Sequence, residues 1–364
     1  MLQICQLLGV IKPCPKFPLM NQSLISKQVR RKNLSAKNMS NQSSEPFPSS
    51  IISTINPYEK LKIIYDPASD TLTRNSSFPI TNSDDDPDTK DVDLNPINKT
   101  WIRIFRPSQS QNNQLLPLII YFHGGGFIQF HANSTVFHNF CKSMADQLSA
   151  MVISVEYRLA PENRLPAAYE DGVESLIWVK NQALDKINGE PWLRNYVDFS
   201  KCFIMGSSAG GNIAYNSCLN ASELDLEPVK ICGLILNQPH FGGVERTDSE
   251  LRLVNDERVP LVVNDLLWEL ALPIRVNRDH VYCNPFADEN LERKLRFVRR
   301  CLVACSKGDP LVDRDIEFAK MLEGKNVQVM SLVAESGFHG MAHTDPNKAK
   351  ELFKIVKDFI FSQV

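Results

Sequence analysis

Apolar residues along the chain gather in short runs that are separated by amphipathic stretches. From about residue 100 the runs are rich in β-branched residues and nearly continuously apolar, which is typical of strands buried on both faces of a parallel sheet. The predicted strands are 101–106, 118–122, 151–157, 202–206, 231–237, 301–305 and 327–333. The predicted helices are 136–149, 167–183, 210–221, 314–324 and 346–361. This alternation predicts an α/β fold, with a mostly parallel central sheet flanked by helices.

Two segments break the alternation. Residues 82–93 are acidic and turn-rich, so we expect a solvated loop between two strands. Residues 240–295 follow a strand and contain an apolar, helix-like stretch. An insert at the carboxyl end of a strand commonly covers a ligand site, although one more packing helix would give the same pattern.

Composition narrows the class of protein. Of 364 residues, 43% are apolar and 23% are charged, which indicates a globular chain with a large core. The net charge of −2 gives no global attraction to nucleic acid or acidic lipid. No apolar run is long enough to predict a membrane span. The nine cysteines lack metal-ligand spacing, so we expect reduced, mostly buried thiols of an intracellular protein and no metal site.

The first part of the chain differs from the rest. Residues 1–44 hold seven basic residues and no acidic one. We expect a disordered leader, or a natural start at Met39, ahead of a domain spanning 45–364. A transit segment is the alternative, because residues 20–44 are also rich in Ser and Asn. Secretion is disfavoured, since residues 2–11 lack a basic flank and a cleavage site. The predicted location is cytoplasmic, with a plastid or other organelle as the alternative.

A serine framed by glycines follows one predicted strand. Residues 206–210 read Gly-Ser-Ser-Ala-Gly, between the strand at 202–206 and the helix at 210–221. Glycines allow a sharp turn that holds the serine out at the sheet edge in a strained conformation. This frame selects Ser208 as a nucleophile over Ser207, and the alternative is a glycine–serine loop without a catalytic role.

Three consecutive glycines end the strand at 118–122. Glycines let the backbone approach a ligand and aim amide N–H groups at a developing negative charge. The predicted oxyanion-hole donors are the N–H groups of Gly124, Gly125, Gly126 and Ala209, with Gly124 the least favoured of the four. A flexible loop is the alternative, and a phosphate loop is disfavoured because its glycine–lysine frame is missing. We expect His123 to anchor the loop.

A general base and an acid are expected after the last two strands. His339 lies in a glycine-flanked turn, with His343 as the second candidate, whereas His240 precedes the insert. Asp309 directly follows a strand end and is preferred to Asp313, which can cap the next helix.

These positions give an ordered set of three catalytic candidates. The order Ser208, Asp309, His339 is that of a Ser–Asp–His triad, in which His339 would take and return the serine proton and Asp309 would orient the imidazole.

Five motifs together resemble the plant carboxylesterases of the hormone-sensitive-lipase-like α/β-hydrolases. They are HGGGF at 123–127, YRLAPE at 157–162, GSSAGG at 206–211, GDPL at 308–311 and GFHG at 337–340. The resemblance covers about residues 50–364 and implies an α/β-hydrolase fold without a cofactor. It also implies a helical cap from about 50–75 and 245–280, with a cap helix near 55–65. Ser207 departs from the Asp of many members, which bears on subgroup rather than on activity.

The resemblance implies a serine carboxylesterase acting on small to medium esters of plant metabolites, with a small-molecule ester as its partner. Similar scaffolds carry out elimination or cyclisation, so a lyase or cyclase is one alternative. A hormone-receptor-like binding protein is another, disfavoured because the gibberellin receptor has lost the histidine that His339 represents here. Possible pocket residues, each of which could equally be core, are Phe127, Phe130, Trp268, Leu272 and Phe338.

Overall fold

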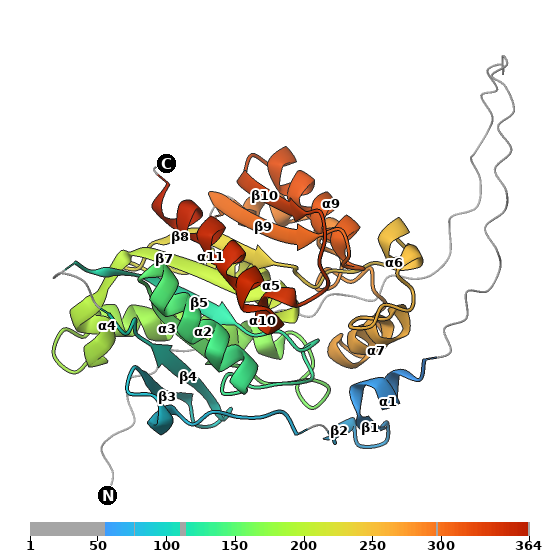
Figure 1. Ribbon diagram of the computed structural model, residues 1–364, viewed down its shortest axis with the longest axis horizontal. Helices are drawn as coiled ribbons and strands as arrows, with labels where there is room; N and C mark the ends of the chain where they lie inside the picture. The colour runs from blue at the N-terminus through green and yellow to red at the C-terminus, as the bar shows by residue number, and fades with distance from the viewer. Residues whose placement is uncertain (1–54, 76, 110–113, 296–297, 363–364) are drawn as a thin grey trace, which may run out of the picture. The chain divides into compact units, whose positions relative to one another are not determined.

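One eight-stranded sheet organises the computed structural model, which describes residues 55–75, 77–109, 114–295 and 298–362 (Figure 1). Its strands are β3 (Thr89–Asn95), β4 (Thr100–Phe105), β5 (Leu116–Phe122), β6 (Met151–Glu156), β7 (Val197–Ser207), β8 (Ile231–Asn237), β9 (Arg300–Ser306) and β10 (Gln328–Ala334). Their order is β10-β9-β8-β7-β5-β6-β4-β3. Neighbours from β10 to β6 are parallel, whereas β4 and β3 are antiparallel additions. A separate hairpin joins β1 (Ile63–Asp66) to β2 (Thr71–Arg74).

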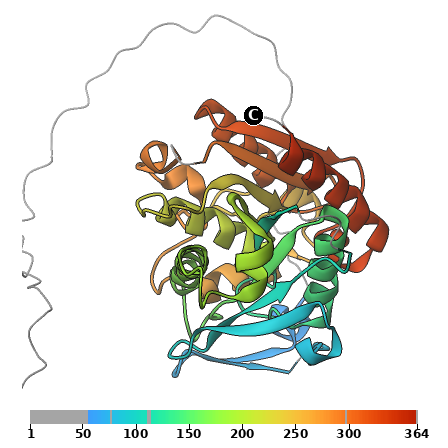
Figure 2. The same ribbon diagram turned by 90° about the vertical axis from the view of Figure 1, so that its left-hand side faces the viewer.

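Helices cover both faces of the sheet (Figures 1 and 2). They are α1 (Pro57–Leu61), α2 (Thr135–Leu148), α3 (Ala167–Leu184), α4 (Pro191–Tyr196), α5 (Ala209–Ala221), α6 (Asp248–Arg252), α7 (Leu261–Ala271), α8 (Leu291–Leu295), α9 (Val312–Gly324), α10 (Met341–Thr344) and α11 (Pro346–Phe361). Two 3₁₀ turns are η1 (Ser83–Asp85) and η2 (Pro285–Ala287). In the described ranges no helix combines the length and apolar character needed to cross a membrane.

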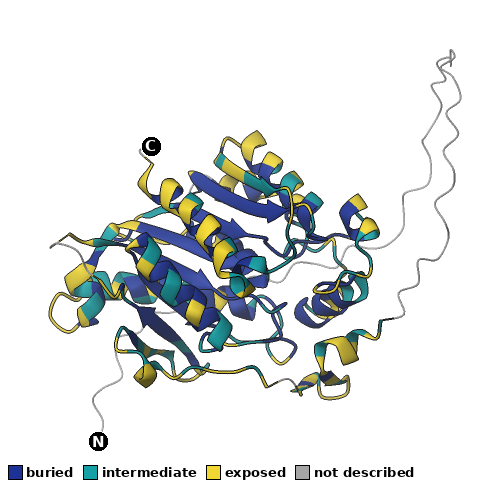
Figure 3. Ribbon diagram, viewed as in Figure 1, coloured by how far each residue is buried: buried dark blue, intermediate teal, exposed yellow. Residues whose placement is uncertain are grey.

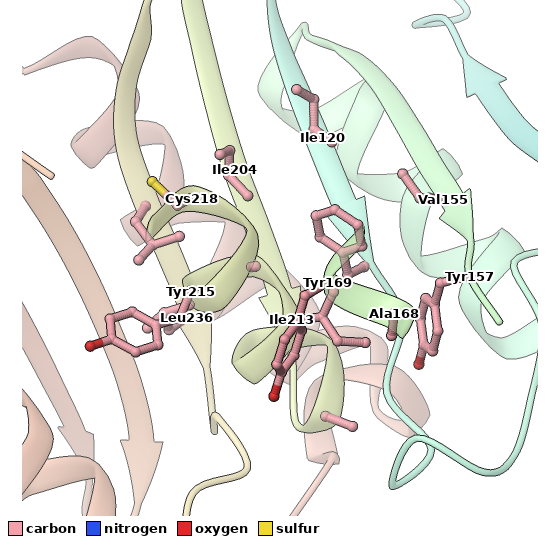
Figure 4. Close-up of a cluster of buried hydrophobic side chains, with 14 of the residues drawn as sticks. Ile120, Val155, Tyr157, Ala168, Tyr169, Ile204, Ile213, Tyr215, Cys218 and Leu236 are labelled. Atoms are coloured by element: carbon pink, nitrogen blue, oxygen red, sulfur yellow. The ribbon is translucent and has the colours of Figure 1, made fainter. Parts of the chain in front are cut away.

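The sheet separates two layers of core. On β5, Ile120 and Phe122 face the layer formed with α3, α5 and α9, whereas Ile119 and Tyr121 face α2 and α11. Figure 4 shows part of the first layer, where Tyr169 of α3 and Ile213 of α5 lie against the strands. Because central strands are covered on both sides, both of their faces are apolar, and they appear as continuous buried ribbons in Figure 3. Each fully buried large side chain contributes roughly 1.5–3 kcal/mol.

The predicted alternation of strands and helices is confirmed, including the mostly parallel order. Each of the seven predicted strands is present as a named strand, and all five predicted helices begin and end within a few residues of their predicted bounds. The seven cysteines among the described residues are free thiols, and all except the half-buried Cys232 are buried. The leader predicted at 1–44 lies outside the described residues.

The prediction of a solvated loop at 82–93 is wrong for its second part, whereas residues 82–88 form exposed or half-buried turns that include η1. Residues from Thr89 onwards form β3, which pairs with β4 at the edge of the sheet. Its Asp91 has a partner on the neighbouring strand, since the guanidinium of Arg103, only 1% exposed, donates two hydrogen bonds of 2.7 Å to the carboxylate of Asp91. The segment therefore has the composition of a loop although part of it is a strand. Charged residues are common on edge strands because they disfavour pairing with a further strand.

Three helices, α1, α6 and α7, lie in the segments where a cap is predicted. The apolar stretch within 240–295 forms α7, and α1 packs against it (Figure 1). Helix α1 begins after Asn56, whose side chain accepts hydrogen bonds from the amides of Tyr58 and Glu59. The boundaries of the cap stay a prediction.

Candidate active site

Ser208 lies in the sharp turn between β7 and α5. Its backbone has φ 55° and ψ −124°, a conformation that costs an L-residue about 1–3 kcal/mol. The surrounding chain holds this turn in place, because the Ser208 amide donates to the carbonyl of Asn237 at 3.0 Å and the Ser208 carbonyl accepts from the amide of His240 at 2.9 Å.

Glycines on both sides of Ser208 are required by space. A Cβ on Gly206 would lie 2.0 Å from the carbonyl oxygen of Gly210. A Cβ on Gly210 would in turn lie 2.0 Å from the carbonyl oxygen of Phe122 on β5. Any side chain at either position would force β5, β7 and α5 apart, so the turn that presents Ser208 can form only with glycine there.

The structure brings together the three residues predicted to form a triad. Nε2 of His339 lies 2.8 Å from Oγ of Ser208, and Nδ1 of His339 lies 2.8 Å from Oδ2 of Asp309. The three side chains follow β7, β9 and β10, so parallel strands deliver them to one edge of the sheet. Asp309 is fully buried, and its other oxygen accepts from the amide of Leu311 at 2.9 Å.

The electrostatics at His339 favour its charged form. Burial lowers the pKa of His339, but the charge of Asp309 and the hydrogen bond to it raise the pKa by more, so that the net shift is above 6.5. The same environment makes the neutral imidazole, 2.8 Å from the Ser208 hydroxyl, a stronger base and stabilises its protonated form.

The loops that carry Asp309 and His339 touch through their backbones. A Cβ on Gly308 would lie 1.9 Å from the carbonyl oxygen of Gly337. Gly337 has φ +144°, which few L-residues adopt. Glycine at both positions therefore allows the two loops to approach closely enough for the aspartate to reach the imidazole.

The glycine loop after β5 runs beside Ser208. A Cβ on Gly124 would lie 3.3 Å from the Cβ of Ser208. Gly125 and Gly126 have φ +120° and +61°, and the Gly125 carbonyl closes a tight turn by accepting two amides. Among the described residues, the backbone N–H groups of Gly125, Gly126 and Ala209 make no hydrogen bond to a backbone carbonyl in a turn, loop or helix cap. The role of these amides in an oxyanion hole stays a prediction.

His123 anchors the start of this loop. Its Nδ1 lies 2.7 Å from the carbonyl oxygen of Gly124, and the hydroxyl of Tyr157 donates to the His123 carbonyl at 2.9 Å. Burial lowers the pKa of His123 to about 4, so the ring is neutral at physiological pH. This geometry agrees with the predicted anchoring role.

Comparison with known proteins places the chain in a family. Residues 119–343 match the model of a family described as alpha/beta hydrolase fold. The chain belongs to the α/β-hydrolase family. The hydrolase is 54% identical over 312 residues to 3-O-acetylpapaveroxine carboxylesterase CXE2 of Papaver somniferum, with 84% of this chain and 99% of that protein covered. It groups with the plant carboxylesterases and is a carboxylic-ester hydrolase.

Two further similarities extend the comparison. The hydrolase is 36% identical over 247 residues to the gibberellin receptor GID1 of Oryza sativa subsp. japonica, with 67% of this chain and 66% of that protein covered. Among solved structures, a Pyrobaculum calidifontis esterase aligns with a TM-score of 0.64 at 23% identity, covering 78% of this chain and 86% of that one. The structural likeness shows the fold, and the receptor is the more distant of the two plant relatives.

A cavity of about 230 Å³ opens onto Ser208 in the hydrolase. One wall, which we call the sheet wall, comes from the strand ends and contains Ser208, Asn237, Gln238, His240, His339 and the glycine loop. A second group of lining residues, which we call the cap wall, consists of Leu61 of α1, Arg258, Val259, and Val263 and Leu267 of α7. Phe130, Phe137 and His343 also line the cavity. The site is therefore a small pocket with polar groups along one side.

Some residues that the sequence suggested for the pocket or for the catalytic acid lie outside this cavity. Phe127 and Trp268 are core residues whose rings contact each other at 5.2 Å, and Leu272 is 3% exposed, away from the cavity lining. Asp313 accepts from the amide of Ser249 at 2.7 Å and so faces α6.

The second histidine candidates have other partners. Nε2 of His343 lies 3.0 Å from the hydroxyl of Tyr121, and Nε2 of His240 contacts the side-chain oxygen of Asn264. Burial lowers the pKa of both His343 and His240 to about 4. Both rings line the pocket as neutral groups, but neither contacts Ser208 through its ring.

Sequence reasoning did not single out Gln238 or Arg258. Gln238 directly follows β8. A polar residue at the carboxyl end of a parallel strand often lies at a ligand site, and this position could have indicated Gln238 from the sequence. Arg258 lies over the ring of Phe338 at 4.7 Å, which only the folded structure reveals. Among the described residues, no three His, Cys, Asp or Glu side chains form a group that could hold a metal ion.

Proposed function

We propose that the hydrolase is a serine carboxylesterase that cleaves small to medium esters of plant metabolites through Ser208, His339 and Asp309. The observation that carries the proposal is the single imidazole of His339, which lies 2.8 Å from both the Ser208 hydroxyl and the Asp309 carboxylate. Geometry of this kind supports nucleophilic catalysis, because the base and its orienting acid are already aligned.

The first half-reaction forms an acyl-enzyme. His339 takes the Ser208 proton as Oγ attacks the ester carbonyl carbon, and the carbonyl oxygen becomes an oxyanion. The amides of Gly125, Gly126 and Ala209 are the proposed donors to that oxyanion, with Gly124 as a further candidate. Each such donor contributes roughly 2.7–4 kcal/mol to lowering the barrier. His339 then gives its proton to the alkoxy oxygen, and the alcohol leaves.

The second half-reaction returns the enzyme to its starting state. A water molecule loses a proton to His339 and attacks the acyl carbonyl carbon. The second tetrahedral intermediate collapses, His339 returns the proton to Oγ of Ser208, and the carboxylic acid leaves. Asp309 holds the imidazole tautomer throughout and stabilises its charged form.

Pocket size supports small acyl groups. A cavity of about 230 Å³ is smaller than most ligand pockets, and in the proposed reaction it holds both parts of the ester. The relative from Papaver somniferum is named for 3-O-acetylpapaveroxine. We therefore propose acetyl and other short acyl esters of hydroxylated plant metabolites as the substrate class.

The test compares hydrolysis of p-nitrophenyl acetate and butyrate by wild type, Ser208→Ala and the neighbouring control Ser207→Ala. We expect Ser208→Ala to lose at least roughly 10³-fold in kcat, and a fluorophosphonate to label the Ser208 peptide in wild type and in Ser207→Ala. Equal rates for Ser208→Ala and wild type would remove Ser208 from the mechanism. A natural substrate converted without incorporating ¹⁸O from water would instead favour a lyase or cyclase.

A further inference from the structure

Gln238 occupies a strained, buried position directly behind the proposed acid and base. Gln238 follows β8, has φ 48°, and is only 2% exposed. Its backbone N–H donates to the carbonyl of Ala304 on β9 at 2.7 Å. Glutamine has no special tolerance for this backbone region, so the position is held by its surroundings. Strain at a sheet edge next to reacting groups points to a role for the side chain.

The side-chain amide of Gln238 joins the Asp309 loop to the His339 loop. Nε2 donates to Oδ2 of Asp309 at 2.7 Å and to the carbonyl of Phe338 at 3.1 Å. Oε1 accepts from the amide of Gly340 at 2.9 Å. The peptide groups on both sides of His339 are therefore held by one side chain, which also holds the acid that orients His339.

The chemistry of these partners explains why an amide is present. The carbonyl of Phe338 and the carboxylate of Asp309 require donors, whereas the amide of Gly340 requires an acceptor. A carboxylate cannot donate, and an apolar side chain of equal length can do neither. Among side chains of this length only glutamine supplies both a donor with two N–H bonds and an acceptor.

We infer that Gln238 is a positioning residue of the esterase reaction, which fixes the His339 loop against Asp309 and shares Oδ2 of Asp309 with the imidazole. The inference rests on the proposed function, since it acts through His339 and Asp309 and touches no reacting atom. Gln238 thus governs both the placement of the base and how much of the carboxylate's charge the base experiences.

This sharing has a consequence for the pH profile. Nδ1 of His339 and Nε2 of Gln238 both contact Oδ2 of Asp309, so the amide withdraws part of the negative charge that stabilises the imidazolium. Removing the donor leaves the full charge to His339, which raises the pKa of His339. At low pH kcat/KM falls because the base is protonated, and we call this part of the pH profile the acid limb. A raised pKa of His339 moves the acid limb to higher pH.

Other charged and titratable groups face the same pair. Asp256, His240 and His343 interact electrostatically with His339, and Asp315 of α9 and Cys305 of β9 interact with Asp309. These groups are unchanged in Gln238 variants. A difference in the acid limb between wild type and variant therefore reports on the amide itself.

The experiment measures pH profiles of p-nitrophenyl acetate hydrolysis for Gln238→Met and Gln238→Glu. We expect Gln238→Met to lower kcat roughly 10–100-fold, the range seen when a partner of a site residue is lost, with KM changed less than about twofold. We also expect its acid limb to move up by about half a pH unit or more. Gln238→Glu keeps the shape and can donate when protonated, so its rate relative to wild type should recover as the pH falls.

A second glutamine of the pocket provides the matched control. Gln129 lines the same cavity, but its side chain donates to the carbonyl of Leu61 at 2.8 Å, away from His339. Gln129→Met should therefore keep the wild-type acid limb. If Gln238→Met unfolds, Gln238→Glu alone carries the test through its pH-dependent recovery.

The outcomes separate two failures. If Ser208→Ala is inactive while both Gln238 variants keep the wild-type acid limb, or kcat within about twofold, the positioning role is overturned and the proposed function stands. If Ser208→Ala retains wild-type activity, the proposed function itself fails.

Discussion

The two walls of the pocket are held by different interactions, the sheet wall by hydrogen bonds and the cap wall mainly by apolar contacts. On the sheet wall, Ser208, Gln238 and His339 are joined to one another or to buried groups by hydrogen bonds of 2.7–3.1 Å. The cap wall is mainly apolar, with Val263 and Leu267 of α7 contributing aliphatic side chains. Hydrogen bonds fix direction, whereas apolar contacts fix mainly volume. The sheet wall is thus suited to chemistry and the cap wall to selecting the shape of an ester.

The supports of the two walls differ as well. Helix α5, behind Ser208, has nearly all of its residues buried between the sheet and α3. Helix α1, on the cap side, has five residues and none of them is buried. Fewer buried contacts mean less stability against local opening. We therefore expect substitutions on the sheet wall to affect kcat strongly and those on the cap wall to affect KM modestly.

The largest expected effect is that of Asp309→Asn. The amide cannot stabilise the charged imidazole, and it favours the wrong tautomer of His339, so kcat should fall by roughly 10⁴-fold. Steady-state hydrolysis of p-nitrophenyl acetate, with active sites counted by fluorophosphonate labelling, measures this. A loss below tenfold would show that the sheet wall does not depend on its acid.

Gly126→Ala tests where the two walls meet. At φ +61° a Cβ would lie 2.5 Å from Cδ2 of Leu267, so the glycine loop must shift and its amides lose alignment. Loss of one oxyanion donor predicts a fall in kcat of roughly 10²-fold. The double variant Gly126→Ala/Leu267→Ala removes the clash. Recovery of activity there would assign the loss to crowding by the cap wall, and no recovery would assign it to backbone strain.

The pH dependence should follow His339. The base must be neutral to take the serine proton, and its pKa is raised above 6.5 by Asp309 against the opposing effect of burial. Activity should therefore fall tenfold per pH unit at pH values below that raised pKa. In Asp309→Asn the raising charge is gone, so the limb should move to lower pH. A pKa below 6.5 from the acid limb of the wild-type kcat/KM profile would contradict this account.

The smallest expected effect belongs to Leu267→Ala on the cap wall. Truncation enlarges the pocket next to Gly126, so KM for p-nitrophenyl butyrate or hexanoate should change by roughly 10-fold or less, since one to three methylene groups are involved. The kcat for the acetate ester should change less than KM for the longer esters. A larger loss in kcat than in KM would mean that α7 supports catalysis directly, and the distinction between the walls would fail.

The sequence predicts the sheet wall better than the cap wall for a physical reason. Buried strands show as continuous apolar runs, and the turns after them carry glycines with steric duties, as at Gly206 and Gly210. Ser208, Asp309 and His339 could therefore be placed at strand ends without knowing any contact. Their catalytic roles stay predictions until they are measured.

Other features were beyond the sequence because they depend on segments that meet only in the fold. The edge strand β3 carries charged residues, and the partner of its Asp91, Arg103, lies on a different strand. Phe127 and Phe130 are equally aromatic, yet only Phe130 lines the pocket. The role of Gln238 requires Asp309, Phe338 and Gly340 to converge, and no local pattern encodes that meeting.

The contact between Gly308 and Gly337 has a mechanical consequence. Because the two loops touch through bare backbone, a displacement of one is transmitted to the other without any intervening flexible side chain. We therefore expect the two loops to move together, so that the 2.8 Å distance between Nδ1 of His339 and Oδ2 of Asp309 is kept.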